Sequence, residues 1–195
     1  MLIKETWMNL RNILLSASVC MCSLGANATT EAQEKIEVLN VIKKFTESVS
    51  CETQPISLKD IYMVERDIKY GSSTYYVLWG GDIGCNGGNT NYSRYVTEVN
   101  KFRRNTTFTI DIVEKDGTLR GLYAFDDTIV HDFIENIKRI NSNKFEVISW
   151  DYASDKWGGK EGGRNFPANK FKYTLERVGY GHWEVSSQVL LEQKK

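Results

Sequence analysis

Three aspartates lie near tryptophans in the sequence, and glycoside hydrolysis uses this pairing of residue types. A glycosidase places two carboxyl groups on either side of the scissile bond, and aromatic rings stack on the sugar. The carboxylates that could serve are Asp82, Asp151 and Asp155, and the rings are those of Trp79, Trp150 and Trp157. The same carboxylates could equally be solvated turn residues. Glycan hydrolysis or glycan binding is therefore one hypothesis for this chain.

The two histidines, His131 and His182, are the other candidates for acid–base chemistry. Either could act as a general base, and either could simply cap an element or lie on the surface. A zinc site takes three or four ligands from Cys, His and carboxylates. The chain offers few such ligands once its cysteines are oxidised. We predict no metal site and no cofactor.

The segment from Trp79 to Asn89 is rich in glycine and carries oxygen donors at Asp82, Asn86 and Asn89. It lacks the Lys-Ser/Thr pair of a P-loop and the fixed acidic positions of an EF-hand. These differences exclude both standard nucleotide and calcium loops. We predict a glycine-rich loop held in place by a disulfide.

Within this segment, the residues Gly84-Cys85-Asn86-Gly87-Gly88 are similar to a segment of papain-like cysteine proteases, in which that cysteine is structural. The resemblance covers five residues. The context around Cys51 is not that of the catalytic nucleophile, and the histidine and asparagine motifs of the family are absent. A nucleophile needs its base and oxyanion donors, so protease activity is excluded.

The first 28 residues have the features of a secretory signal peptide. Lys4 and Arg11 supply a basic start, residues 13–22 are apolar, and Ala26-Asn27-Ala28 fits a signal-peptidase site. We therefore expect cleavage near Ala28 and a bacterial periplasmic or secreted protein, a single domain over residues 29–195. In an oxidising compartment, we expect Cys51 and Cys85 to form a disulfide.

The charge of the chain narrows the classes of partner. There are 25 basic and 25 acidic residues, and the formal net charge is zero. Nucleic-acid binding needs a basic face, which this balance does not favour. No segment after the signal peptide is apolar enough to span a membrane.

The fold class predicted from the sequence is α+β, with an N-terminal helix packed on a mostly antiparallel sheet. A capping box of Thr30 and Gln33 begins a helix over residues 30–50, whose apolar stripe would be Ile36, Leu39, Ile42, Phe45 and Val49. Hairpins are predicted over residues 61–79, 108–125 and 171–189. Residues 127–140 fit either a helix or a short helical turn followed by a hairpin strand, and the second is favoured.

Aromatic residues near the glycine-rich segments indicate a binding function. Tyr and Trp on loops carried by a rigid sheet form many recognition surfaces, although core packing explains the same residues equally well. The residues predicted to bind are Trp79, Asp82, Asn86, Asn89, Tyr92, Trp157 and Phe166, on loops 79–93 and 155–167. The leading hypothesis is a non-enzymatic protein-binding module, such as an inhibitor or immunity protein against an envelope hydrolase or toxin. A glycan-binding or glycan-hydrolysing protein and a structural envelope protein are the alternatives.

Overall fold

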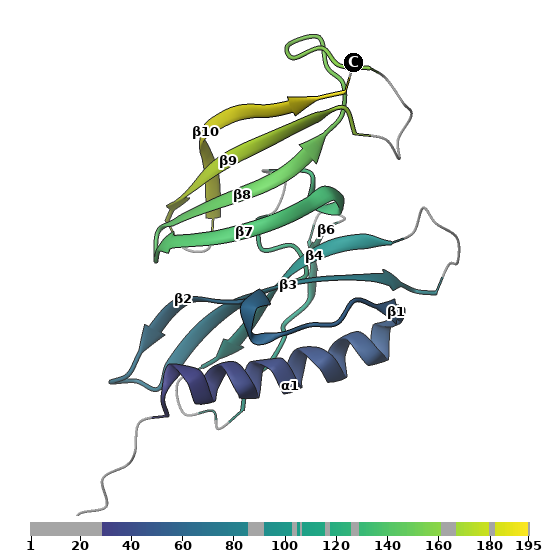
Figure 1. Ribbon diagram of the computed structural model, residues 1–195. Helices are drawn as coiled ribbons and strands as arrows, with labels where there is room; N and C mark the ends of the chain where they lie inside the picture. Colours follow the sequence, from purple (N-terminus) through teal and green to yellow (C-terminus); the bar gives the residue numbers. More distant parts are fainter. Residues whose placement is uncertain are drawn as a thin grey trace, which may run out of the picture.

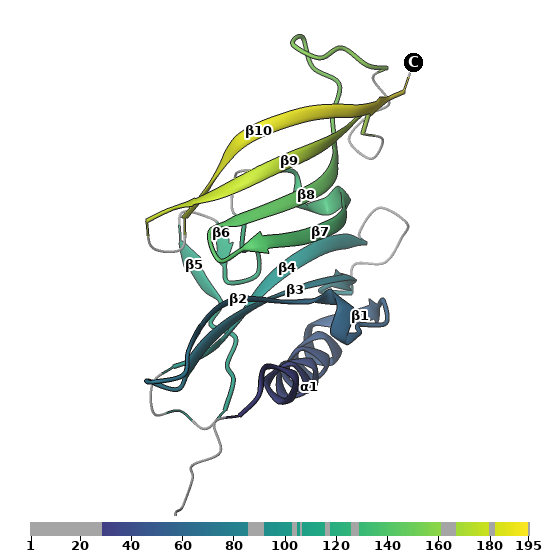
Figure 2. The ribbon, with the colours of Figure 1, turned by 60° about the vertical axis from the view of Figure 1, so that its left-hand side comes forward.

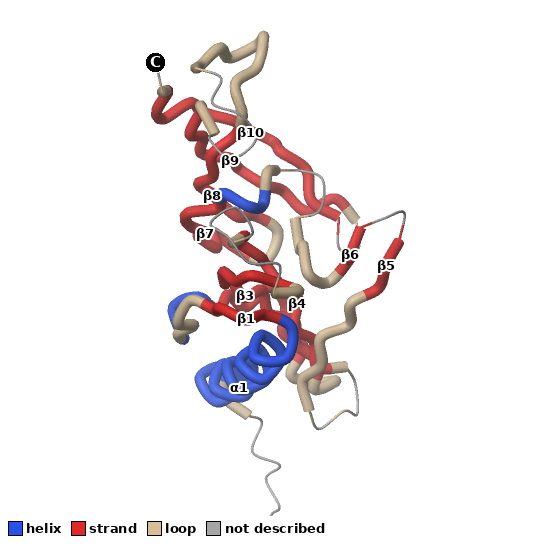
Figure 3. Tube along the Cα trace, turned by 90° about the vertical axis from the view of Figure 1, so that its right-hand side faces the viewer, coloured by secondary structure: helices blue, strands red, loops and turns tan. Residues whose placement is uncertain are grey.

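The computed structural model consists of one helix and two antiparallel sheets stacked in three layers (Figure 1). It describes residues 29–85, 92–102, 105, 107–115, 118–125, 129–160, 167–179 and 182–194. The helix lies on one face of the first sheet, and the second sheet covers the opposite face (Figures 2 and 3). The predicted α+β class is confirmed in this broad sense, although most of the regular structure is β. We expected a single sheet, whereas the structure has two main sheets.

Helix α1 (Glu31–Val49) begins at the predicted capping box. The Thr30 hydroxyl accepts a hydrogen bond from the backbone N–H of Gln33, and the Gln33 side chain accepts one from the backbone N–H of Thr30. The buried positions of the helix are Glu34, Val38, Ile42 and Thr46. The predicted stripe was therefore wrong at Ile36, which is 51% exposed, because the buried face is rotated towards Glu34.

The first sheet is built around one long strand, β3. Its members are β1 (Ser50–Thr53), β2 (Ile61–Asp67), β3 (Ser72–Ile83) and β4 (Ser93–Lys101), and the 3-10 helix η1 (Leu58–Asp60) leads into β2. Strands β1 and β2 pair with opposite ends of β3, and β4 pairs along its other side. The predicted hairpin over residues 61–79 is confirmed by the β2–β3 pairing.

The second sheet is an antiparallel meander in the order β10-β9-β8-β7. After the 3-10 helix η2 (His131–Phe133), it contains β7 (Ile134–Asn141), β8 (Lys144–Asp151), β9 (Asn169–Val178) and β10 (His182–Gln193). The helical turn and strand favoured for this region are confirmed, and so is the hairpin over residues 171–189.

The hairpin predicted over residues 108–125 is shorter than expected. It consists of β5 (Val113–Lys115) and β6 (Thr118–Arg120), which pair with each other. Residues 108–112 do not form a strand, and contact the first sheet through a bridge between Asn100 and Thr109. The alternation that suggested a strand here instead serves packing, since Phe108 is buried beside the first sheet.

The first sheet is buried on both faces. Towards the helix, it contributes Tyr75, Val77 and Trp79 to a core with Val38 and Ile42. Towards the second sheet, alternate residues such as Tyr76 and Leu78 enter another core, which also contains Phe125, Phe145, Phe171 and Trp183. The Trp183 indole N–H donates to the Tyr76 hydroxyl over 2.9 Å, so this core contains a polar contact between the sheets.

A buried ionic cluster fastens α1 to the first sheet. Glu34 is 5% exposed and contacts Arg66 Nε at 2.9 Å, Lys101 Nζ at 3.5 Å and the Tyr75 hydroxyl at 2.9 Å. Arg66 also donates to the backbone carbonyl of Thr29. Burial alone would raise the pKa of Glu34, but the hydrogen bonds from Arg66 and Tyr75 and the nearby positive charges hold that pKa below its usual value.

Candidate functional site

Trp79 lies in the core, and the prediction that it stands on a loop is wrong. It belongs to β3, stacks on Tyr95 with ring centroids 4.5 Å apart, and meets Phe45 edge to face. Its indole N–H donates to the Thr97 hydroxyl over 2.8 Å. Buried in this way, Trp79 has almost no surface with which to contact a partner.

The glycines that suggested a loop here serve close packing within the sheet. A Cβ on Gly80 would lie 2.7 Å from the Tyr92 hydroxyl, and one on Gly81 would lie 2.6 Å from the Ser50 hydroxyl. Gly80 and Gly81 both lie within strand β3, and the close approach of neighbouring atoms leaves no room there for a larger side chain. Glycine in a strand and glycine in a loop have the same sequence signature, which explains the error.

Replacing Thr97 with valine should destabilise the protein by about 1–3 kcal/mol, because the buried indole N–H of Trp79 would lose its acceptor. Denaturant unfolding with a near-UV circular dichroism spectrum would measure this. Thr53→Val, on an exposed position of β1, is the matched control and should change stability little. Equal stability of the two variants would contradict the prediction.

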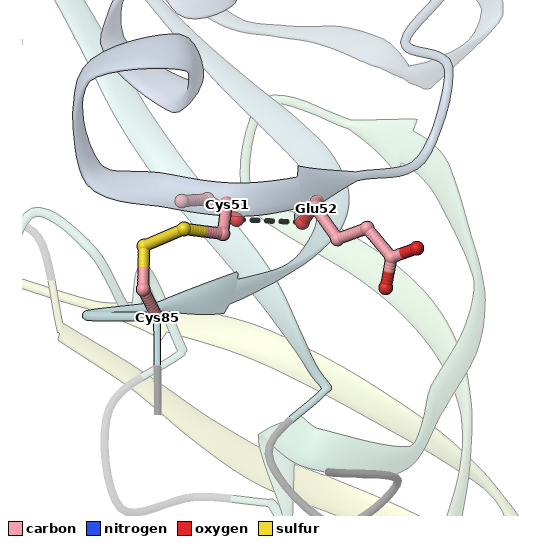
Figure 4. The surroundings of a disulfide bond; sticks show 4 residues. Cys51, Glu52 and Cys85 are labelled. Atoms are coloured by element: carbon pink, nitrogen blue, oxygen red, sulfur yellow. Dashed lines mark hydrogen bonds between the residues drawn. A yellow bond between two sulfur atoms is a disulfide. The ribbon is translucent and has the colours of Figure 1, made fainter. Parts of the chain in front are cut away.

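The disulfide between Cys51 and Cys85 is present, with an S–S distance of 2.00 Å and Cα atoms 5.2 Å apart (Figure 4). It joins β1 to the end of β3. Nearby, the Ser50 hydroxyl donates to the Glu52 carbonyl over 2.6 Å, and the backbone N–H of Gly84 donates to the Val49 carbonyl over 3.0 Å. These contacts fix where the chain leaves the sheet.

The other predicted binding residues are dispersed. Asp82 is buried near the end of β3, and Trp157 is half-buried, with its ring edge to face against Phe171 at 5.1 Å. Tyr92 lies just before β4. Asn86, Asn89 and Phe166 lie outside the described residues.

The candidate acid–base residues also lie apart in the fold. Asp82 belongs to the first sheet, Asp151 ends β8 in the second sheet, and Asp155 lies in the exposed turn that follows. His131 packs edge to face on Tyr123 with ring centroids 5.0 Å apart, whereas His182 is exposed and lies 3.9 Å from Glu184. In the described part of the chain, no three His, Cys, Asp or Glu residues are grouped to hold a metal ion.

A groove between the two sheets is the best candidate site, and we call it the inter-sheet groove. Its volume is about 340 Å³, and it is lined by Gln54, Tyr92, Arg94, Asp132, Phe133, Ile134, Glu135 and Trp150. One wall comes from the segment after β1 and the start of β4, and the other from η2, β7 and β8. Three of these residues are aromatic and four are polar or charged, so the groove could contact a partner through both apolar and charged groups.

Trp150 is held in a fixed orientation at this groove. Its indole N–H donates to Glu135 Oε1 over 2.6 Å, and Lys170 Nζ contacts the other Glu135 oxygen at 2.5 Å. The ammonium groups of Lys170 and Lys194 lie 5.5 and 4.6 Å from the centre of the Trp150 ring. These contacts hold the partly exposed Trp150 ring in a single rotamer. A partner that binds the ring would therefore cost it little conformational entropy.

The charges of the groove are arranged around Glu135. Partial burial would raise the pKa of Glu135, but hydrogen bonds from Lys170 and Trp150 and the charge of Arg94 lower it. Arg94 donates to the side-chain carbonyl of Gln54, which orients its guanidinium group. Burial raises the pKa of Tyr92, whose hydroxyl oxygen is buried towards Gly80, so Tyr92 offers the groove its ring. The groove therefore combines oriented charges with hydrogen-bond donors.

Parts of both predicted recognition loops lie near this groove. Tyr92 lies near the end of the first predicted loop, and Lys160 and Ala168 of the second loop region are hydrogen-bonded to residues beside Trp150. The backbone N–H of Lys160 donates to the carbonyl of Lys194, and that of Ala168 donates to the carbonyl of Asp151. Of the predicted binding residues that the structure describes, only Tyr92 lines the groove.

The sequence analysis missed Arg94 and Glu135. Arg94 lies inside a strand, and Glu135 lies within the segment 127–140 whose structure the sequence left open, so neither belongs to a motif. Trp150 was predicted as a ring that could stack on a sugar and was not among the residues predicted to bind a protein. Trp150 and Lys170 lie opposite each other on β8 and β9. This cross-strand pair could have indicated the site from the sequence, but only if the register of the two strands had been known.

No family model, curated protein or solved structure matches this chain. No helix in the described part of the chain is long and apolar enough to cross a membrane.

Proposed function

We propose that this is an exported, non-enzymatic binding protein that recognises a protein partner through the inter-sheet groove. The observation that carries the proposal is the fixed, partly exposed ring of Trp150 beside the oriented charges of Arg94 and Glu135. Interfaces depend on a few Trp, Tyr and Arg residues at their centre, and this groove contains all three types. A disulfide is compatible with an oxidising compartment.

The proposed mode of recognition is insertion of a protruding side chain of the partner between Tyr92 and Trp150. The groove has room for one such side chain, and its rim is polar and charged. An inhibitor or immunity protein acting on an envelope hydrolase or toxin would use such a surface. The groove residues would then supply most of the affinity for the partner. The neighbouring loops would determine which partner is recognised.

Substituting Trp150 with alanine should weaken partner binding by about 30-fold, as expected when a hot-spot residue worth about 2 kcal/mol is truncated. The exported protein and W150A would be used to capture partners from native envelope extract, and any protein captured would be purified and titrated against both. Tyr70→Ala is the matched control, because Tyr70 is an exposed aromatic residue on the turn between β2 and β3. Equal affinity of W150A and the unmodified protein would rule out this groove.

Glycan binding is the second candidate, and the size of the groove favours it. A volume of about 340 Å³ lined by Tyr92, Phe133 and Trp150 suits one or two sugar units, with Arg94, Asp132 and Glu135 as hydrogen-bonding groups. Screening the protein and W150A on a glycan array would test it. Glycan signals that W150A loses, together with an empty protein capture, would favour this candidate over the first.

A further inference from the structure

Exposed apolar side chains gather at one end of the first sheet, which we call the tip (residues 68–70 and Phe102). On the turn between β2 and β3, Ile68 is 65% exposed and Tyr70 is 43% exposed, and Phe102, directly after β4, is 50% exposed. The turn and Phe102 lie at the same end of the sheet, because Ser73 near the start of β3 pairs with Lys101 at the end of β4. Exposed apolar side chains that gather in this way mark an interaction surface.

The polar groups of the tip suit a lipid headgroup region. The ammonium group of Lys69 lies 5.2 Å from the centre of the Tyr70 ring, so a cation and an aromatic ring stand side by side. The carboxylate of Asp67 accepts a hydrogen bond from the backbone N–H of Tyr70 over 3.1 Å, which holds it within the turn. Tyrosine and long basic side chains are typical of the places where proteins meet the bilayer–water interface.

The start of the folded chain lies beside the tip. The backbone carbonyl of Thr29 accepts a hydrogen bond from Arg66, which precedes the turn on β2. Figures 1 and 2 show the start of α1 and the β2–β3 turn at the same lower end of the molecule.

The predicted signal peptide would therefore hold this end of the molecule near the membrane. Its apolar segment covers residues 13–22, and the seven residues from there to Thr29 span at most about 25 Å when extended. Helix α1, with 19 residues, is roughly 28 Å long, so the tether is shorter than the helix. While the apolar segment lies in a bilayer, the tip is the end of the folded domain that reaches the bilayer most readily.

We propose that the tip docks on the surface of a lipid bilayer and keeps the exported protein peripheral to the membrane after the signal peptide is removed. Ile68 and Phe102 enter the headgroup region, and Lys69 contacts lipid phosphates. Only a few side chains insert, so the docking is reversible. The lining of the inter-sheet groove contains none of these residues, so the groove stays open to a partner while the tip is docked.

Flotation with vesicles of phosphatidylethanolamine and phosphatidylglycerol tests the docking. The exported protein should float with the vesicles. Ile68→Glu and Phe102→Glu should each lower the apparent affinity about tenfold, because each replaces an inserted apolar side chain with a charge. Leu191→Glu is the matched control, since Leu191 is 49% exposed on β10 of the second sheet, and it should float like the unmodified protein. Thermal unfolding would check that the three variants, all changed at exposed positions, keep the fold.

A fluorescent probe locates the contact independently. Cys51 and Cys85 are bonded to each other, so Ile68→Cys supplies a free thiol that an environment-sensitive dye can label. The emission of the dye should shift to shorter wavelength when vesicles are added. The same dye on Leu191→Cys should show no shift.

Three results would overturn the proposal. The first is a protein that stays out of the vesicle fraction at every lipid concentration, and the second is equal vesicle binding by I68E, F102E and L191E. The third is loss of a captured protein partner by I68E and F102E without any vesicle binding, which would make the tip a protein contact. Trp150→Ala, which tests the groove, should float like the unmodified protein, so the proposed function and this inference can fail separately.

Discussion

Replacing Glu34 with alanine should lower the free energy of unfolding by about 3–5 kcal/mol, which is typical when one member of a buried ionic cluster is removed. Arg66 and Lys101 would keep their charges in a buried setting without the carboxylate that neutralises them. The Tyr75 hydroxyl would lose its acceptor as well. Urea unfolding followed by tryptophan fluorescence measures the change.

The matched control is Glu31→Ala on the same helix. Glu31 forms an exposed ion pair with Lys35 at 3.3 Å, and such a pair contributes at most about 0.5 kcal/mol. A loss of stability in E34A no larger than that in E31A would show that solvent already screens the cluster.

The same carboxylate predicts a pH dependence of stability. The pKa of Glu34 is lower in the folded protein than its ordinary value of 4.5, so the folded state binds the proton less readily than the unfolded state. The stabilisation is therefore fully present above pH 4.5 and is lost as the pH falls through the folded-state pKa. The stability difference between the protein and Glu34→Gln should shrink over this acid range, and a difference that is constant down to pH 3 would contradict this.

Replacing both Cys51 and Cys85 with serine should destabilise the protein by about 3–4 kcal/mol. The bond closes a loop between residues 34 positions apart, and its loss would restore that freedom to the unfolded chain. Strand β1 is short and pairs with β3 through Ser50 with Ile83 and Thr53 with Gly81.

The effect should extend to the inter-sheet groove. Gln54 directly follows β1, and its backbone N–H donates to the Gly80 carbonyl while its side chain holds Arg94. Denaturant unfolding with and without reductant would measure the stability change, and the double-serine variant should be insensitive to reductant. A reductant effect below 1 kcal/mol on the unmodified protein would contradict the prediction.

Local patterns in the sequence predicted the local structure well. The capping box at Thr30, the β2–β3 and β9–β10 hairpins and the Cys51–Cys85 bond depend on neighbouring residues or on a single possible pairing. Glu34 was not part of the predicted buried stripe of the helix, because nothing in the helix reveals that Arg66 and Lys101 will lie over it. Such partners depend on tertiary contacts that no local pattern encodes.

The candidate site could not be predicted for the same reason. Its walls come from two sheets whose strands lie far apart in the sequence, and Arg94 and Glu135 acquire their importance only when the sheets meet. Trp79 was chosen over Trp150 because it stands beside glycines. Those glycines make room for Tyr92 and Ser50 within the sheet, and Trp79 itself fills the core.

The double burial of β3 has a consequence for the chain before it folds. The run from Tyr75 to Trp79 is uncharged, contains no proline, and consists of aromatic, branched and aliphatic residues, a composition that favours aggregation. In the folded protein both faces of this strand are covered, so the hazard exists only while the chain is unfolded. Refolding yields should therefore fall steeply as protein concentration rises, until α1 and the second sheet have closed over this strand.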